Sequence, residues 1–373
     1  MPIYFCGTCE YTTEQKSRMD AHRARKNPCK PKNTLNKLVE EKVREVLAAT
    51  PAAPAAPPSP LPPPPPPPST PVVITTPFLK WVGGKTQIID SVMALFPKTM
   101  KNYHEPFVGG GSVLFALLSH VKAGKITLTG KAYASDLNAN IINLYKTVQT
   151  NPEGLITETA ALVTPFAALK GTTVNRKPAT IEEALTSQES YYYWIRAQFN
   201  ALTGAERQTP KAAAMCLFLN KTDFRGMYRD GPNGFNVPFG NYKTPTILTA
   251  DHIRAVSTLI RDVIFTPQPF SASLANATDG DFIYLDPPYA PESNTSFVGY
   301  TGDGFGLDAH TLLFTTCAEM KAKNVKILMS NANVKLVRDA FPSPAFQTKT
   351  IQARRAINSK NPEATTMEVL ITN

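Results

Sequence analysis

The sequence has no long apolar run and little cysteine. None of its 373 residues lies in an uncharged apolar stretch of about 18, and the start, MPIYFCGTCEYTTEQK, has no signal-peptide pattern. We therefore expect neither a membrane protein nor a secreted one. Three of the five cysteines (Cys6, Cys9, Cys29) crowd into the first 29 residues, and Cys216 and Cys317 stand far apart. This is no disulfide framework, and it favours a reducing compartment inside the cell, with nucleus and cytoplasm both open.

A G-x-G-x-x-G pattern is also absent, which disfavours a dinucleotide cofactor. The charge is mildly basic: 39 Lys and Arg against 29 Asp and Glu, a net of +10. Residues 1–50 contribute +4, residues 51–71 carry no charge, and the remainder contributes +6. An anionic partner such as nucleic acid therefore suits either part of the chain.

The sharpest change of composition is the segment 51–71, PAAPAAPPSPLPPPPPPPSTP, with 13 of the 34 prolines. Proline lacks the amide donor, so this segment predicts an extended spacer, or a docking site for a proline-reading protein partner. Before it, NTLNKLVEEKVREVLAA (33–49) has helical apolar spacing and predicts a short helix, with self-association as the alternative. The predicted organisation is a zinc-finger module at 1–32, a short helix at 33–50, a proline-rich linker at 51–76, a first catalytic segment at 77–150, an inserted recognition domain at 151–250 and a second catalytic segment at 251–373.

After the linker, short apolar runs alternate with amphipathic segments. The runs end at EPFVGGG (105–111), YASD (133–136), FIYLDPPY (282–289) and KILMSNA (326–332), and SVLFALLSH, NANIINLYKTVQ and DAHTLLFTTCAEMKA read as helices. This rhythm predicts an α/β fold with a mostly parallel sheet, and the end of the chain predicts a closing β-hairpin. Residues 150–250 break the rhythm and read as a mainly helical insert, then loops.

The N-terminal segment has the spacing of a small zinc module. Its ligands would be Cys6, Cys9, His22 and Cys29, three sulfurs and one nitrogen in a tetrahedral site. Met19 would pack beneath the metal. So small a module buries too little to fold without zinc. DNA, a protein partner or a purely structural role are all open for it.

Three motifs of the large segment fit one chemistry. EPFVGGGSV follows a strand and opens a helix, so its glycines let a ligand approach the backbone and the free amides of the helix start. Asp136 ends the next strand, where a carboxylate suits a ribose diol. In D-P-P-Y (286–289), two prolines hold a carboxylate, backbone carbonyls and an aromatic face together, a set that binds a planar amino group.

With these motifs the chain resembles the DNA adenine methyltransferase (Dam) family of the alpha group. The resemblance covers residues 77–373 and is carried, in order, by FLKWVGGK (78–85), EPFVGGGSV, SDLNANIINLY (135–145), FNVPFGNYK (235–243) and DPPYAP, with RRAINS near the end. It implies a Rossmann-like fold that uses S-adenosylmethionine and transfers its methyl group to the N6 of adenine in duplex DNA, after the base flips out of the helix.

The resemblance also implies residue roles. The cofactor would be bound by Trp81, Lys85, Phe107, Gly109, Gly110, Gly111, Asp136, Phe270 and Asp286. The target adenine would be held by Asp286, Pro287, Pro288 and Tyr289. The DNA-reading residues would be Lys80, Phe224, Arg225, Met227, Arg229 and Pro238.

The chain departs from the family at two reading positions. Arg225 stands where the family commonly has Asn, and Asn241 where an Arg is common. The resemblance therefore leaves the recognition sequence open, and GATC is the first site to test. Two further function classes stay open: a non-catalytic DNA-binding protein on a methyltransferase scaffold, and the same chemistry on RNA adenine or on a cytosine amine.

Overall fold

The computed structural model describes residues 4–5, 12–13, 15–24, 76–291, 305–354 and 365–373. They belong to two compact units, one within residues 1–65 and one within 66–373. None of the helices in these ranges is long and apolar enough to cross a membrane.

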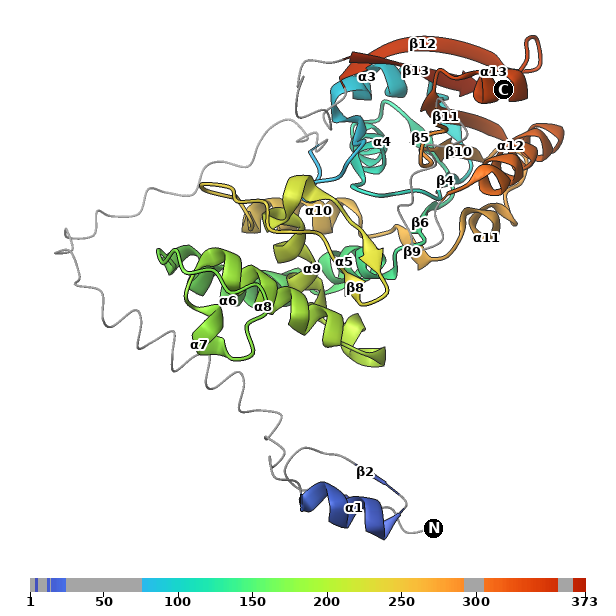
Figure 1. The fold of residues 1–373 in the computed structure, drawn as a ribbon. Coiled ribbons are helices and arrows are strands. Elements are labelled where there is room, and N and C mark those ends of the chain that lie inside the picture. The colour runs from blue at the N-terminus through green and yellow to red at the C-terminus, as the bar shows by residue number, and fades with distance from the viewer. Residues whose placement is uncertain (1–3, 6–11, 14, 25–75, 292–304, 355–364) are drawn as a thin grey trace. The chain divides into compact units, whose positions relative to one another are not determined.

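A seven-stranded sheet is the centre of the larger unit, in the order β12-β13-β11-β10-β4-β6-β9 (Figure 1). Five strands run parallel, β13 is antiparallel to β11, and β12 pairs antiparallel with β13. The expected mostly parallel α/β fold and its closing hairpin are confirmed. The strands are β4 (Tyr103–Glu105), β6 (Ala132–Asp136), β9 (Ile264–Pro267), β10 (Phe282–Leu285), β11 (Lys326–Ala332), β12 (Gln347–Arg354) and β13 (Thr365–Thr372).

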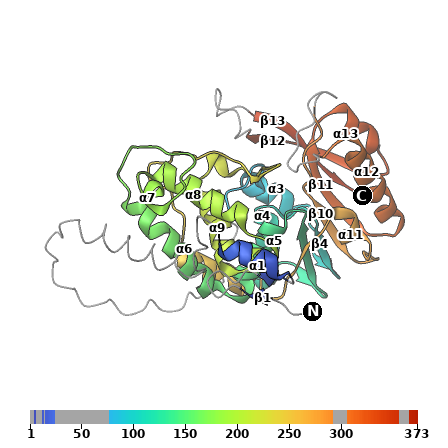
Figure 2. The same cartoon turned by 60° about the horizontal axis from the view of Figure 1, so that its bottom comes forward.

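The central strands are apolar on both faces because helices cover both. All four residues of β10, FIYL, are buried, as parallel strands require. On one face, α11 (Phe270–Leu274), α12 (Leu307–Ala322) and α13 (Lys335–Ala340) share a core with β10, β11 and β13, and α12 and α13 lie beside β11 in both views (Figures 1 and 2). The opposite face is covered by α4 (Ser112–Lys122) and α5 (Ala139–Thr150), where the Tyr145 ring stacks on Phe265 of β9, with 5.0 Å between ring centroids.

The remaining segments of the larger unit are mainly helical. Between α5 and β9 lie α6 (Pro152–Ala168), α7 (Ile181–Ala184), α8 (Gln188–Ala201), η2 (Gly204–Gln208), α9 (Pro210–Thr222), η3 (Phe224–Gly226), the two-stranded ladder of β7 (Asp230–Gly231) and β8 (Gly234–Phe235), and α10 (Ala250–Leu259). Nearly all of α9 is buried, since it packs against α5, α6 and α8. Before β4, the chain forms η1 (Lys85–Ile88) and α3 (Ile89–Met93), and β3 (Thr99–Met100) pairs with β5 (Thr127–Leu128).

The strand order reverses between β4 and β10. From β4 the chain moves to β6 and β9 on one side, and from β10 to β11 on the other. A crevice opens at the carboxyl ends of the two strands at such a reversal, and ligands of open α/β sheets bind there. Both the glycine motif, which follows β4, and D-P-P-Y, which follows β10, lie at this point.

In its described residues, the smaller unit has a two-stranded antiparallel ladder, β1 (Tyr4–Phe5) with β2 (Thr12–Thr13), and the helix α1 (Lys16–Arg23), which packs against both strands. On α1, Met19 and His22 are buried at 1% and 5% exposure, three residues apart and so on one face. Cys6, Cys9 and Cys29 lie outside the described residues, as do the predicted helix at 33–49 and the proline spacer.

Candidate active site

The turn after β4 is built so that only glycine fits. A Cβ at Gly109 would meet the Trp81 ring, one at Gly110 would lie 2.8 Å from the Trp81 Cβ, and Gly109 and Gly111 have positive φ (44° and 76°). Gly111 is the N-cap of α4. The structure thus brings Trp81, predicted from a separate motif, directly onto the glycine turn, next to the free amides of a helix start.

Asp136 closes this turn from the end of β6. Its carboxylate accepts the Gly109 N–H at 3.1 Å and the Asn138 N–H at 2.9 Å. Burial raises its pKa above the usual range, and these backbone donors oppose that rise. On the other side of the turn, the Tyr145 hydroxyl donates to the Gly109 carbonyl at 2.9 Å. The carboxylate and the glycine turn are therefore parts of one rigid unit.

An aromatic pair lies at the start of the glycine turn. Phe107, at the start of the turn, stacks on Phe270 of α11 with 5.6 Å between centroids, and Phe305 packs edge-on to Phe107 at 5.9 Å. Phe107 and Phe270 are thus neighbours although they stand far apart in sequence. Such an aromatic pair can hold a flat heterocycle.

The D-P-P-Y motif is next to Lys85. The Lys85 Nζ lies 2.7 Å from both carboxylate oxygens of Asp286 and donates to the Gly83 carbonyl at 2.6 Å. Lys85 itself is only 4% exposed. Burial raises the pKa of Asp286, whereas the Lys85 ammonium acts in the opposite direction. A partly buried carboxylate with an ammonium partner is a strong hydrogen-bond acceptor.

The rest of the D-P-P-Y loop is held by contacts from distant elements. The Tyr289 hydroxyl donates to Glu368 of β13 at 2.8 Å, and the Tyr289 ring lies 5.1 Å from the Lys85 Nζ. Pro287 is buried and Pro288 is half-buried. Neither proline has an N–H, so the two residues after Asp286 present carbonyl acceptors and no backbone donors.

The predicted DNA-reading residues fall into two groups. Lys80 lies with its Nζ 3.6 Å from the centre of the Tyr242 ring, and the hydroxyl of the same tyrosine accepts the Arg225 N–H at 2.9 Å. Phe224, 44% exposed, donates its N–H to the carbonyl of Pro238. The first group is therefore Lys80, Phe224, Arg225 and Pro238, and the carbonyl of Phe224 also accepts the N–H of Met227. Arg229 lies further along the loop, where its Nε donates to Asn236 at 2.6 Å.

The two positions where the chain departs from the family share an unusual backbone. Arg225 and Asn241 have positive φ, 65° and 50°. Asparagine adopts this left-handed conformation readily, whereas for arginine it costs about 1 kcal/mol. The local fold therefore holds the Arg225 backbone in a conformation that its side chain does not favour.

Asp223 is a fully buried carboxylate under this group. Its Oδ1 accepts the Gly226 N–H at 2.8 Å, but its Oδ2 has no hydrogen-bond partner. Burial raises its pKa to about 9, against the smaller opposing effects of the Gly226 N–H and of Lys80. Burial therefore favours the neutral form of the Asp223 carboxyl.

Four polar residues of the site were not found from the sequence. Glu105, in β4, is buried with a pKa of about 8 and accepts the Tyr103 hydroxyl at 2.6 Å. Glu368, His310 and Asn331 contact the D-P-P-Y loop from three other elements. Glu368 and Asn331 are visible in the sequence as polar residues within apolar strands, whereas nothing in the sequence distinguishes His310 from the other polar residues of its helix.

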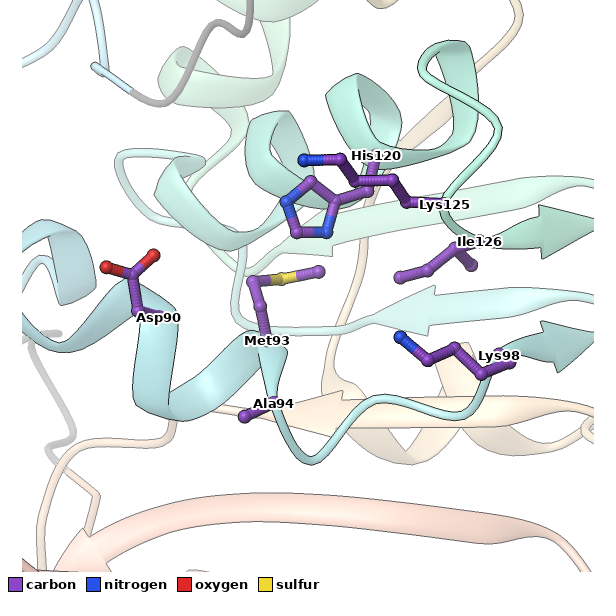
Figure 3. A pocket seen from close by; sticks show the side chains of 7 residues that line it. All are labelled: Asp90, Met93, Ala94, Lys98, His120, Lys125 and Ile126. Atoms are coloured by element: carbon purple, nitrogen blue, oxygen red, sulfur yellow. The ribbon is translucent and has the colours of Figure 1, made fainter.

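A hollow of about 360 Å³ lies elsewhere on the larger unit (Figure 3). Its lining combines apolar side chains with basic ones and one carboxylate, from α3, α4 and the segments beside β3 and β5: Asp90, Met93, Ala94, Lys98, His120, Lys125 and Ile126. Burial and the nearby ammonium groups of Lys125 and Lys98 lower the pKa of His120. None of the predicted site residues lines this hollow, so it is separate from the crevice at the strand reversal.

Fold and site together define an α/β methyltransferase with a glycine cradle after its first central strand and D-P-P-Y after its fourth. The model of the D12 class N6 adenine-specific DNA methyltransferases matches residues 81–357. The chain belongs to this family.

Named relatives agree with the family. The chain is 34% identical over 292 residues to the type II methyltransferase M.MjaIII of Methanocaldococcus jannaschii, covering 76% of this chain and 93% of the relative. It is 32% identical over 290 residues to the DNA adenine methylase of Haemophilus influenzae, covering 77% and 89%. The type II methyltransferase M1.LlaDCHI of Lactococcus lactis is 30% identical over 302 residues, covering 80% and 95%. The expected enzyme class, an adenine-specific DNA methyltransferase, is confirmed.

The buried carboxyl of Asp223 yields a stability prediction. Its pKa is raised in the folded state, so ionisation of Asp223 opposes folding. The free energy of unfolding is therefore unaffected by this group below about pH 4 and decreases as the pH rises towards 9. Asp223→Asn keeps the acceptor for Gly226 and cannot ionise. It should be more stable than the native protein by about 1–3 kcal/mol at pH 8 and close to it at pH 4.5, in urea unfolding.

The matched control is Asp262→Asn, at an exposed carboxylate. It should change the free energy of unfolding equally little at both pH values. An Asp223→Asn protein whose stability difference from the native chain does not grow with pH would show that Asp223 is ionised in the fold.

Proposed function

We propose that this enzyme binds S-adenosylmethionine in the crevice at the strand reversal and methylates the N6 of an adenine flipped out of duplex DNA, at a short site for which GATC is the first candidate. The observation that carries the proposal is the position of Asp286. Its carboxylate is paired with Lys85 at 2.7 Å and is followed by two prolines that have no N–H, next to a glycine turn that no larger residue fits.

The crevice residues fit the parts of S-adenosylmethionine. The Asp136 carboxylate would accept hydrogen bonds from the ribose hydroxyls, and the stacked Phe107 and Phe270 rings would hold the adenine. The amides at Gly109–Gly111 and the Lys85 ammonium suit the methionine carboxylate, with Trp81 as the wall. When bound, the cofactor supplies a methyl group on a positively charged sulfur.

The D-P-P-Y loop would activate the target amine. The lone pair of an adenine N6 is delocalised into the ring, so the nitrogen is a poor nucleophile. Asp286 and the Pro287 carbonyl would each accept one N6 hydrogen, which favours a tetrahedral nitrogen and localises the lone pair. The Tyr289 ring would stack on the base. Lys85 keeps Asp286 in the ionised, accepting form, so the rate arises from positioning and electrostatics.

DNA would be read by the loop after α9 together with Lys80. Phe224, exposed, would fill the gap that the flipped base leaves, and Arg229 can make a bidentate contact with guanine. Lys80, Met227 and Pro238 would contact neighbouring bases. Because Arg225 and Asn241 both depart from the family and both have a left-handed backbone, they are where the recognised sequence would diverge from GATC.

The smaller unit would be a zinc finger bound through Cys6, Cys9, His22 and Cys29. The buried Met19 and His22 on one face of α1, packed against the β1–β2 ladder, fit the helix side of such a module. Zinc would supply the cross-link that so small a core lacks. Basic residues on its helix, with Arg18 exposed, suit DNA phosphates, and a protein partner for the finger or for the proline segment is the second candidate.

The proposed function is tested by nucleoside mass spectrometry. Enzyme and S-adenosylmethionine are incubated with an unmethylated GATC duplex, with a duplex that differs only at that site, and with RNA of the same sequence. We expect 6-methyladenine in the GATC duplex alone, and a loss of about 10³-fold or more with Asp286→Ala.

Any other methylated product would contradict a particular part of the proposal. Methylation of both duplexes rejects GATC and points to Arg225 and Asn241. A methylated cytosine or methylated RNA changes the target. An Asp286→Ala protein as active as the native enzyme would remove the proposed mechanism.

The ion pair predicts a pH effect. If Asp286 must be ionised, kcat falls as the pH drops through its raised pKa. Lys85→Met removes the ammonium that opposes this rise, so the acidic limb of kcat should move to higher pH. The measurement is kcat against pH at saturating cofactor and DNA. Lys80→Met, a lysine that faces Tyr242 instead, should leave the limb in place. Superimposable limbs for the Lys85 variant and the native enzyme would exclude Asp286 as the ionising group.

The proposed zinc finger predicts that zinc and DNA affinity can be lost without loss of methylation. Cys9→Ser should lose one zinc per chain, by metal analysis, and weaken DNA binding by about tenfold at low salt, with a shallower salt dependence. Methylation by residues 72–373 should be unchanged at saturating DNA. Loss of zinc with the same affinity and salt slope would leave the finger a protein-binding or structural role.

A further inference from the structure

The D-P-P-Y loop is contacted by His310, a residue outside both the D-P-P-Y motif and the cofactor motifs. His310, in the first turn of α12, is 1% exposed. Its Nε2 lies 3.2 Å from the carbonyl oxygen of Pro288, and its Nδ1 lies 3.0 Å from the carbonyl oxygen of Gly306, the N-cap of α12. One ring therefore joins the start of a helix to the second proline of the loop.

The direction of these contacts follows from chemistry. A carbonyl oxygen can only accept and a neutral imidazole carries one N–H, so the contact with Pro288 is a hydrogen bond in the tautomer that has its proton on Nε2. Pro288 offers no N–H that could tie the loop in another way, and its carbonyl is the neighbour of the Pro287 carbonyl. By binding the Pro288 carbonyl, His310 restricts the backbone next to the Pro287 carbonyl.

The imidazole itself is held firmly. Phe305 packs edge-on against it at 4.7 Å and Phe314 at 5.9 Å, measured between ring centroids. Phe305 is also a neighbour of Phe107 and Phe270, at 5.9 and 6.1 Å. A ring wedged between aromatic side chains has little freedom to turn, so its Nε2 is a fixed point for the loop.

A second contact holds the loop from the adjacent strand. Asn331 of β11 is fully buried, and its Oδ1 accepts the N–H of Ala290 at 3.0 Å, directly after D-P-P-Y. The loop is thus bound on both sides of Tyr289, by α12 at residue 288 and by β11 at residue 290.

We propose that His310 is a positioning residue of the methyl transfer: its Nε2–H holds the Pro288 carbonyl, with Asn331 as the opposing anchor, so that Asp286 and the Pro287 carbonyl are aligned on the target amine. The inference rests on the proposed role of the loop. His310 touches neither substrate nor cofactor and acts through the backbone of the loop.

A matched pair of variants separates this role from simple support of the helix. The amide nitrogen of Gln reaches the position of Nε2, whereas that of Asn reaches the position of Nδ1. His310→Gln therefore keeps the loop contact and His310→Asn keeps only the contact to Gly306. We expect kcat within about threefold of the native enzyme for Gln and a loss of about 30–100-fold for Asn, since misplacement by about 1 Å has effects of that size.

The readouts are kcat, KM for duplex DNA, the dissociation constant for S-adenosylmethionine and the melting temperature, all with the full chain. For His310→Asn the loss should lie in kcat, with KM and the cofactor dissociation constant within about threefold. Thr316→Val, which removes a buried hydroxyl that bonds Leu312 within the same helix, is the control and should leave kcat unchanged.

Equal kcat for the folded Gln and Asn variants would overturn the proposal, as would a folded Gln variant that has lost more than about 30-fold. If His310→Asn does not fold, Asn331→Ala decides from the other side of the loop, with the same loss in kcat expected and unchanged kcat overturning the proposal. Asp286→Ala, measured in parallel, distinguishes failure of the proposed function from failure of this inference. If the Asp286→Ala variant is active, the proposed role of the loop is wrong. If it is inactive while the His310→Gln and His310→Asn variants have equal kcat, only the inference about His310 is wrong.

Discussion

The parallel pairing of β4 with β10 is the constraint on which the site depends. It sets Tyr103 beside Phe282 and so brings the glycine turn and the D-P-P-Y loop, which are far apart in sequence, to the same sheet edge. The strand order reverses there, which is the point where ligands of open α/β sheets bind. Lys85 then reaches the same point from the start of η1, and its ion pair with Asp286 ties a third part of the chain to it.

Burial of carboxyl groups is the second common feature. Glu105, Asp136, Asp223 and Asp286 all have pKa values raised by burial, yet their surroundings differ. Asp286 has an ammonium partner, Asp136 has backbone donors, and Glu105 has a tyrosine hydroxyl. Asp223 has a backbone donor on one oxygen only. A buried carboxylate is expensive without partners, so the number of donors around each one indicates which can remain charged.

Much of the fold could be predicted because the local patterns were strong. The apolar runs that end at 136, 285 and 332 became β6, β10 and β11, and the helices expected at SVLFALLSH and NANIINLYKTVQ became α4 and α5. The short motifs also identified the residues at the strand ends. The contacts of His310, Glu368 and Asn331 with the D-P-P-Y loop could not be predicted, because nothing in sequence spacing says which buried polar side chain meets which loop.

The sequence by itself determined the class of protein: an α/β methyltransferase whose carboxylate, glycines and D-P-P-Y stand at strand ends, since local periodicity and short motifs depend only on neighbouring residues. The tertiary structure decided what those residues touch. Only the folded chain places the Lys85 ammonium against Asp286, the Trp81 ring over the glycine turn and the Arg225 backbone in a left-handed conformation. These contacts join residues from different elements, and their geometry follows from the packing of helices on the sheet.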